Sequence, residues 1–417
     1  MKQDAQKRDD IIVIGGGIVG LAIAEKLSSE GKSVLLIEKE KIAAGASAGN
    51  AAGLAFSDIM PLASPGILFK AIRWLLDPLG PFTVVPQDLP KTLPWLTRFM
   101  MATRPAKYRR SITVQASLMH LAGKAMDDML ARTGLDTLIH QGGALHLYES
   151  ERDYQKDLKN WDYRRRHSID FECYEKDDLH QFQPGLAKNF VAGIFVPHWK
   201  SVSNPLTFCK ALHDILSQRP FRTVYSAVRS VEASESGVTV QTENGPYDGQ
   251  KVIIAAGPWS SSLARQLGDM IPLIGERGYN TTFPKSALTL TRTLVFPGHG
   301  FVISPLADGI RVGGASEIAR LGRKENFNRS KAMVSKAQKF VPALRTQDAA
   351  EWMGARPSIP DSLPVIGFSS RSKNILYAFG HGHLGLTQSA ATGQLVSDLI
   401  NKTPPSIDLA ALSPHRF

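Results

Sequence analysis

The sequence predicts an α/β protein with two domains, the first of which is assembled from separate parts of the chain. At 417 residues the chain is longer than one ordinary compact core. It opens with a strand, a glycine-rich turn and a helix, and it closes with another strand, turn and helix. Between these ends, segments with strand alternation are interleaved with Pro-rich loops and amphipathic helices. This order is typical of an α/β domain into which a second domain has been inserted.

The predicted elements place the domain boundaries. The first domain is expected to contain strands 11–14, 33–37, 251–256 and 374–379, helices 18–27 and 386–400, and antiparallel strands within 223–240. The second is expected to contain a mostly antiparallel sheet that includes 278–315, together with helices 114–132 and 330–341. We therefore assign residues 1–62, 196–270 and 350–417 to the first domain, and residues 63–195 and 271–349 to the second.

Composition narrows the class of protein. A hydrophobic share of 43%, with 35 Gly and 25 Pro, fits a soluble globular protein rather than a disordered or collagen-like one. Cys173 and Cys209 form neither a disulfide framework nor a metal-binding spacing, so we expect a reducing compartment and no metal site. The start of the chain has no apolar signal region, and charges interrupt every apolar stretch before about 20 residues, so a cytoplasmic protein without a spanning helix is expected.

The charge of the chain favours anionic partners. Lys and Arg number 49 against 38 Asp and Glu, and basic residues cluster within 98–110, 164–166 and 320–331. No aromatic stripe or nucleic-acid motif accompanies them, so nucleic acid is not expected as a partner. A solvated basic face and peripheral contact with phospholipid both remain open.

The opening glycine cluster has the spacing of a dinucleotide-binding turn. Gly15, Gly17 and Gly20 meet the pattern G-x-G-x-x-G between a predicted strand and a predicted helix. The first glycine permits the tight turn, the second admits a pyrophosphate, and the third lets helix and strand pack closely. Glu38 ends the next strand, where a carboxylate accepts hydrogen bonds from ribose hydroxyls and disfavours a 2′-phosphate. A Rossmann-like unit that binds FAD or NAD is therefore expected.

The end of the chain favours FAD over NAD. Residues 380–385 repeat the glycine spacing before the last helix, but no strand and no acidic ribose ligand follow, so they do not form a second dinucleotide unit. A helix N-terminus carries partial positive charge, which suits the negative charge on the pyrimidine side of a reduced flavin. Residues 45–53 are small side chains with Ser47 and Asn50 among them, and we interpret them as a cradle for the flavin and inner phosphates, or else as a flexible loop.

The sequence resembles the D-amino acid oxidase superfamily of FAD-dependent oxidoreductases, and within it the small subunits of D-amino acid dehydrogenase. The resemblance spans nearly the whole chain. Its most specific parts are the opening glycine motif and residues 47–53, 64–66, 70–75, 255–259, 356–361 and 380–382. It implies non-covalent FAD and oxidation of a D-amino acid to an imino acid, with hydride transfer from the α-carbon to flavin N5. No cysteine follows Cys209, in keeping with non-covalent attachment.

The resemblance and the motifs together nominate the cofactor-binding residues. They are Gly15, Gly17, Ile18, Val19, Gly20, Glu38, Lys39, Ser47, Asn50, Ala51, Gly53, Val228, Ala256, Gly257, Trp259, Gly382, His383, Leu384, Gly385, Leu386 and Thr387.

Four residues are candidates for contact with substrate. The resemblance places the substrate carboxylate on Arg356, whose planar guanidinium can hold a carboxylate through two hydrogen bonds; a salt bridge within the fold is the alternative. Tyr279 matches a substrate-contacting position, with core packing as the alternative. His383 and His198 differ from relatives that act on D-alanine, and a histidine at either place predicts D-proline or D-hydroxyproline as substrate, although ordinary structure explains each as well. Hydride transfer needs alignment more than a base, so no general base is assigned.

The electron acceptor and the reaction class stay open. A helix within 64–77 has an apolar and a basic face, so it either packs in the second domain or rests on the inner membrane, where a quinone would accept electrons. A sarcosine- or glycine-oxidase-like enzyme that uses oxygen is the first alternative. A non-catalytic FAD-binding assembly protein and a tRNA-modifying flavoprotein are the others, and the latter usually carries a methyltransferase domain that is absent here.

Overall fold

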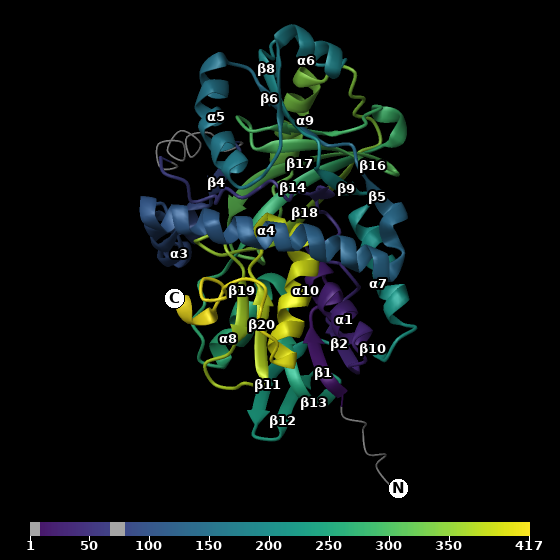
Figure 1. Cartoon of the computed structure of the whole chain (residues 1–417), viewed down its shortest axis with the longest axis vertical. Coiled ribbons are helices and arrows are strands. Elements are labelled where there is room, and N and C mark those ends of the chain that lie inside the picture. Colours follow the sequence, from purple (N-terminus) through teal and green to yellow (C-terminus); the bar gives the residue numbers. More distant parts are fainter. Residues whose placement is uncertain (1–8, 67–79) are drawn as a thin grey trace.

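The computed structural model describes residues 9–66 and 80–417, so most of the predicted helix within 64–77 lies outside the described residues. Two large sheets lie one above the other along the long axis of the molecule (Figure 1). The first sheet is at the end that carries the N-terminus, and the second occupies the opposite end. The predicted two-domain α/β fold, with a Rossmann-like part and a mostly antiparallel part, is confirmed.

The first sheet has parallel strands at its centre. Its strands, in spatial order, are β10 (Phe221–Tyr225), β2 (Val34–Glu38), β1 (Asp9–Ile14), β13 (Gly245–Ile254), β12 (Gly237–Thr242) and β11 (Val228–Ser234), with β20 (Ile375–Phe379) beside the end of β13 and β19 (Val365–Phe368) beside β20. The β10–β2, β2–β1, β1–β13 and β13–β20 pairs are parallel. The carboxyl ends of β1, β2, β13 and β20 therefore meet at one edge, where ligands of such sheets bind.

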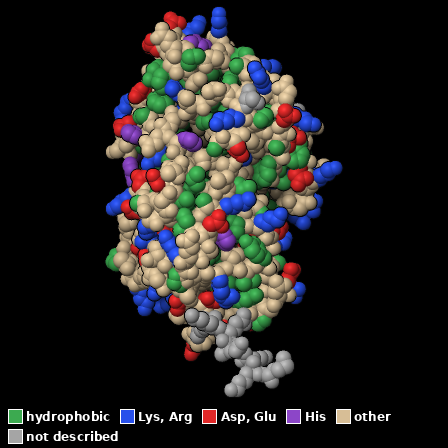
Figure 2. Space-filling model, turned by 90° about the vertical axis from the view of Figure 1, so that its right-hand side faces the viewer, with side chains coloured by type: hydrophobic (Ala, Val, Ile, Leu, Met, Phe, Trp, Pro, Cys, Tyr) green, Lys and Arg blue, Asp and Glu red, His purple; other side chains and the backbone are tan. Residues whose placement is uncertain are grey.

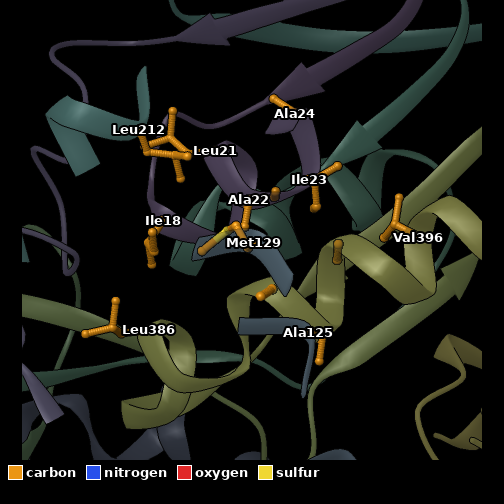
Figure 3. Packing of buried hydrophobic residues seen from close by; sticks show 14 of the residues in the cluster. Ile18, Leu21, Ala22, Ile23, Ala24, Ala125, Met129, Leu212, Leu386 and Val396 are labelled. Atoms are coloured by element: carbon orange, nitrogen blue, oxygen red, sulfur yellow. The ribbon is translucent and has the colours of Figure 1, made fainter. Parts of the chain in front are cut away.

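Helices cover this sheet because its central strands are apolar on both faces. The helices α1 (Ile18–Ser29) and α10 (Gly385–Asn401) pack against each other, and α4 (Pro105–Thr133) and α7 (Pro205–Leu216) complete one layer. Figure 3 shows Leu21 and Ala22 of α1 near Met129 of α4, Leu212 of α7 and Val396 of α10. The short helix α8 (Ser260–Gln266) belongs to the cluster on the other face.

The second sheet has nine strands, and most of its pairs are antiparallel. In spatial order they are β18 (Ala350–Ser358), β14 (Ile274–Pro284), β17 (Gly309–Ile318), β16 (Phe301–Leu306), β15 (Thr293–Phe296), β6 (Ala144–Tyr148), β8 (Ala192–Val196) and β7 (Glu172–Glu175), with β4 (Phe82–Val84) beside β17. Only β15–β6 and β17–β4 are parallel among these described pairs.

The two faces of the second sheet differ in chemistry because side chains alternate along each strand. One face carries apolar residues such as Leu145, Leu294 and Ile303, which pack against α9 (Asn328–Phe340). The other face turns toward the first sheet. Because β18 pairs with β14, this strand belongs to the second sheet although it lies within 350–417, the range that the sequence assigned to the first domain.

The remaining elements join or cover the two sheets. They are α3 (Leu89–Ala102), α5 (Glu151–Arg166), α6 (Lys176–Phe182), the three-stranded sheet of β3 (Gly53–Leu54), β9 (Lys200–Val202) and β5 (Ile139–His140), and short 3-10 turns. On the face shown in Figure 2, Lys and Arg side chains are interspersed with Asp and Glu. Within the described ranges no helix combines the length and the apolar character needed to span a bilayer.

Candidate active site

A cavity of about 1390 Å³ lies where the edge of the first sheet meets the second sheet. Every residue nominated for cofactor binding, apart from Gly20, lines this cavity. So do three of the four candidates for contact with substrate, Arg356, Tyr279 and His383. The volume exceeds that of most small-ligand pockets, about 300–1,000 Å³, and thus accommodates a dinucleotide together with a small substrate.

The glycine turn between β1 and α1 has the geometry that its sequence predicted. Gly15 adopts a positive φ of 112°, and a Cβ there would lie 2.5 Å from the Ala255 carbonyl oxygen. Gly20 lies one turn into α1, where a Cβ would lie 1.9 Å from the Gly15 carbonyl oxygen. Gly20 therefore acts through close packing of helix and turn rather than through cavity contact.

Polar groups surround the N-terminus of α1. The residue before the helix is Gly17, which has no side chain to cap it, and the first turn of α1 holds no acidic residue. The Ser47 hydroxyl accepts a hydrogen bond from the Ile18 N–H at 3.0 Å, and Glu38 accepts one from the Gly16 N–H at 2.6 Å. A helix N-terminus with no acidic residue in its first turn suits a pyrophosphate, and Glu38 at the strand end suits a ribose.

The second sheet holds the small-residue loop against the cavity. Arg311 donates hydrogen bonds to the carbonyl oxygens of Ala48 at 3.1 Å and Asn50 at 2.6 Å. Asn280 donates to the Gly49 carbonyl oxygen at 2.8 Å. The sequence did not identify Arg311 or Asn280, since nothing local in β14 or β17 points to a loop more than 200 residues away. These contacts make the loop a held cradle rather than a free segment.

The start of α10 faces the same cavity. The turn Gly382–Leu384 leads into α10, whose N-terminus has no side-chain cap. Thr387 in its first turn accepts a hydrogen bond from the Ala55 N–H at 3.0 Å, which ties this helix to the segment after the loop. Two helix N-termini and a loop of small residues therefore border one cavity. These residues fit FAD: the N-terminus of α1 would hold the pyrophosphate, and the loop and the start of α10 would hold the flavin.

Arg356 lies on β18 beside Glu276 on β14. The two residues are directly opposite in the antiparallel register, and Nη1 of Arg356 is 3.0 Å from Oε1 of Glu276. Nη1 also approaches the Ala315 carbonyl oxygen at 3.3 Å, whereas Nη2 reaches only the Gly314 carbonyl oxygen, at 3.5 Å. The salt bridge that the sequence allowed as an alternative is present, yet it occupies one edge of the guanidinium. The Arg356 side chain remains 25% exposed in the cavity wall, so its guanidinium can still meet a carboxylate from the cavity.

Two features hold the Arg356 guanidinium in place. It lies against Gly278, where a Cβ would be 2.4 Å from Nη2. Glu276 is itself fixed by the hydroxyls of Ser316 and Ser358, both at 2.7 Å. Burial raises the pKa of Glu276, but the charge of Arg356 and the two hydroxyls together lower the pKa by more than burial raises it. The pKa of Glu276 therefore lies below its ordinary value, and Glu276 is ionised at neutral pH. The sequence signal that could have identified Glu276 is its charge within β14, a strand that is otherwise half apolar.

Tyr279 and His198 lie less favourably for contact with substrate than Arg356 and His383 do. Tyr279 alternates with Gly278 on β14, so its ring lies on the opposite face from Arg356, and its hydroxyl donates to Glu317 at 2.7 Å and accepts from the Asn326 N–H at 3.2 Å. His198 is 80% exposed, lies 3.8 Å from Asp170 and does not line the cavity. Tyr279 still lines the cavity, although its hydroxyl already has partners within the second sheet, whereas exposed His198 lies outside the cavity.

Asp58 links His383 to Arg164 in the cavity. Nε2 of His383 is 3.1 Å from Oδ2 of Asp58, and Arg164 of α5 lies 3.8 Å from the other Asp58 oxygen. His383 also lowers the pKa of Glu276 through its charge. Asp58 and Arg164 were missed because they come from a loop and an inserted helix that only the fold brings together.

Comparison with known proteins agrees with this geometry. The family model described as "FAD dependent oxidoreductase" matches residues 10–399. A protein of Bradyrhizobium diazoefficiens named D-amino-acid oxidase is 31% identical over 418 residues, and the match covers 98% of each chain. A protein of Mesorhizobium japonicum named D-amino acid dehydrogenase 1 is 26% identical over 98% of this chain and 99% of its own.

Among solved structures, glycine oxidase from Geobacillus kaustophilus superimposes with a TM-score of 0.76 at 23% identity, over 98% of this chain and 99% of its own. L-proline dehydrogenase from P. horikoshii superimposes with a TM-score of 0.73 at 19% identity, over 99% of this chain and 98% of its own. At these identities the structures show a shared fold. The family resemblance and FAD as cofactor are confirmed: this chain is an enzyme of the FAD-dependent oxidoreductase family.

Proposed function

We propose that this enzyme oxidises the carbon next to the carboxylate of a D-amino acid and forms an imino acid that water then hydrolyses. The observation that carries the proposal is Arg356, a guanidinium in the cavity wall that Glu276 holds in place and that is still 25% exposed. Relatives named D-amino-acid oxidase and D-amino acid dehydrogenase, which match over nearly their whole length, support the substrate class.

FAD, when bound, accepts the two electrons and the hydrogen that leave the α-carbon. The protein's part is to position the amino acid. Arg356 binds the carboxylate through the guanidinium N–H groups that Glu276 does not occupy, and Glu276 prevents the guanidinium from turning. Because Glu276 already balances the charge of Arg356, Arg356 holds the carboxylate chiefly through directed hydrogen bonds rather than through net charge. The amine must be neutral when the C–H bond breaks, and we assign no residue as its base.

We propose His383 as a contact for the substrate beyond the carboxylate. Its Asp58 partner orients the imidazole, and the residue lines the cavity beside the start of α10. An oriented imidazole can bond a ring nitrogen or hydroxyl, which supports D-proline or D-hydroxyproline among the preferred substrates.

We also propose that a quinone at a membrane surface accepts the electrons. The helix α3 supports this, because Leu89, Leu93 and Met101 are 43%, 54% and 43% exposed, with Lys91 and Arg98 exposed between them. Leu89 also lines the cavity. Such a surface suits an anionic bilayer. Cosedimentation with phosphatidylglycerol vesicles tests it: we expect binding that Leu93→Asp abolishes, and absence of binding at low salt would contradict it.

One experiment tests the proposed reaction. The purified enzyme, loaded with FAD, is mixed anaerobically with D- and L-amino acids, D-proline, D-hydroxyproline, glycine and sarcosine, and bleaching of the flavin absorbance is followed. We expect D-amino acids to bleach the flavin at least about 100-fold faster than their L-enantiomers, because one Arg356-anchored orientation aligns only one hydrogen with the flavin.

Two outcomes would replace the proposal. Bleaching by glycine and sarcosine alone, with peroxide released in air, would favour the glycine-oxidase-like alternative. Failure of every amino acid to bleach a flavin that remains bound would favour a non-catalytic FAD-binding protein.

A further inference from the structure

Four polar atoms in the wall of the cavity have no hydrogen-bond partner in the described part of the chain. They are Nε2 of His146, Nε1 of Trp199, Oγ1 of Thr293 and Oγ of Ser304. All four residues line the cavity, Thr293 is 2% exposed, and Ser304 is fully buried. None of them was needed to explain the cofactor or the substrate carboxylate.

The register of the second sheet brings three of these residues together. Thr293 is opposite Ala144 in the β15–β6 pair, and His146 comes two residues later on β6, so both point to the same face. The antiparallel β15–β16 pair places Leu294 opposite Ile303, so Thr293, one residue earlier on β15, lies opposite Ser304, one residue later on β16. Three adjacent strands thus present a polar row toward the cavity.

The same face also holds the small-residue loop. Ser304 is opposite Arg311, the residue that bonds the carbonyl oxygens of Ala48 and Asn50. At the other end, the Trp199 ring lies against Gly53, where a Cβ would be 2.9 Å away, and its centroid is 6.3 Å from that of His146. The four atoms therefore form one polar ledge, His146, Trp199, Thr293 and Ser304, beside the place where the loop cradles the flavin.

Unpartnered buried polar groups are rare and cost stability, so a cluster of them in a cavity wall indicates a ligand that bonds them. The ledge offers an N–H from Trp199, two hydroxyls that donate or accept, and an imidazole. A purely aliphatic ligand would leave all of them unbonded. A polar ligand group would bond several at once.

The charges around the ledge favour an uncharged ligand group. Burial, together with the charge of Arg164, lowers the pKa of His146 to about 4, so its imidazole is neutral at pH 7. Arg164 already faces Asp58, and Asp157 accepts hydrogen bonds from Tyr148 and Asn160. An added carboxylate would lie close to two existing carboxylates, and an added ammonium would lie close to Arg164.

We propose that the ledge is the side-chain subsite of the substrate and selects D-amino acids whose side chain ends in an uncharged hydrogen-bonding group, a carboxamide or a hydroxyl. The inference rests on the proposed function and adds the substrate class to it. A hydroxyl on a cyclic substrate would satisfy the same atoms.

Three amino acids of nearly equal shape test the proposal: D-asparagine, D-leucine and D-aspartate. We expect kcat/KM for D-asparagine to exceed those for D-leucine and D-aspartate by about tenfold or more, because each hydrogen bond that only the carboxamide makes contributes up to about tenfold. Thr293→Val removes one hydroxyl with little change of shape. It should reduce the preference for D-asparagine over D-leucine by about 3- to 10-fold.

Thr281→Val is the matched control. Thr281 is a threonine of the same sheet, 3% exposed and equally unpartnered, but it lies on the α9 face and does not line the cavity. This variant should keep the wild-type preference, and its unfolding shows how much a buried Thr→Val change alone affects stability.

The results separate the two proposals. Turnover of D-alanine with equal kcat/KM for D-asparagine and D-leucine would overturn the subsite and leave the proposed function standing. An equal loss with every substrate in Thr293→Val, with weaker FAD binding, would show that the ledge contacts the flavin and would also overturn the subsite. Absence of turnover with any D-amino acid would overturn the proposed function itself.

Discussion

At the scale of single residues, the carboxylate site depends on what restrains Arg356. An arginine side chain has many rotamers, and binding through two hydrogen bonds requires one of them. Glu276 restrains one edge of the guanidinium, while Gly278 leaves room for its plane to lie flat on the strand. A carboxylate and a missing side chain thus define the site as much as the arginine does.

Gly278→Ala should therefore impair substrate binding without unfolding the protein. The new Cβ would lie 2.4 Å from Nη2 of Arg356 and push the flexible guanidinium aside. We expect kcat/KM to fall about 10- to 100-fold for all amino acids, with FAD content unchanged. Gly313→Ala is the control on the same face, because its Cβ would meet only ordinary contacts at 3.4 Å or more. Equal activity of the two variants would contradict this account of Gly278.

Glu276→Gln should alter the pH dependence of stability. Because the pKa of Glu276 is lower in the folded protein than its ordinary value of 4.5, its ionisation stabilises the fold above pH 4.5, and this contribution is lost as the pH falls through the folded pKa. We expect the variant to be less stable than wild type by about 1–3 kcal/mol at pH 7 and by less at pH 3.

Urea unfolding at both pH values measures this difference. Glu235→Gln, in the exposed turn between β11 and β12, removes the same charge without burial and is the control. A difference between wild type and Glu276→Gln that is the same at pH 7 and pH 3 would contradict the proposed role of the Glu276 charge.

At the scale of elements, two helical glycines should respond oppositely to alanine. In α1, a Cβ on Gly20 would lie 1.9 Å from a backbone oxygen that cannot move away, so Gly20→Ala should destabilise the protein by about 1–3 kcal/mol and weaken FAD binding. In α4, a Cβ on Gly123 would meet nothing within 4 Å, so Gly123→Ala should stabilise by about 0.5–1 kcal/mol. Thermal or urea unfolding measures the stability of both variants relative to wild type. If both variants were more stable, or both less stable, the packing argument would be contradicted.

The elements around the cofactor were predictable because their signals are local. The strand, glycine turn and helix of the N-terminus carry their own periodicity and spacing, and Glu38 ends a strand that follows directly. Tyr279 shows what such local signals leave open. The resemblance suggested contact with substrate and the residue lines the cavity, but the alternation of β14 turns its ring to the α9 face, in keeping with the core-packing alternative.

At the scale of the whole molecule, the site exists only where the two sheets meet. Arg356 and Glu276 are 80 residues apart, and His383 and Asp58 are 325 apart. No periodicity or motif of a single sequence encodes such pairs, since they follow from strand register and from how the inserted domain packs. Arg356 itself was predicted only through the family resemblance, and its partners were not.

The most direct test of the account is the rate at which a D-amino acid reduces the bound flavin in wild type and in Arg356→Met, measured anaerobically by rapid mixing. Two charge-assisted hydrogen bonds of about 1.5–3 kcal/mol each predict a loss of about 10²- to 10⁴-fold in the second-order rate constant. The FAD content should remain that of wild type. An Arg356→Met enzyme that reduces its flavin as fast as wild type would contradict the account.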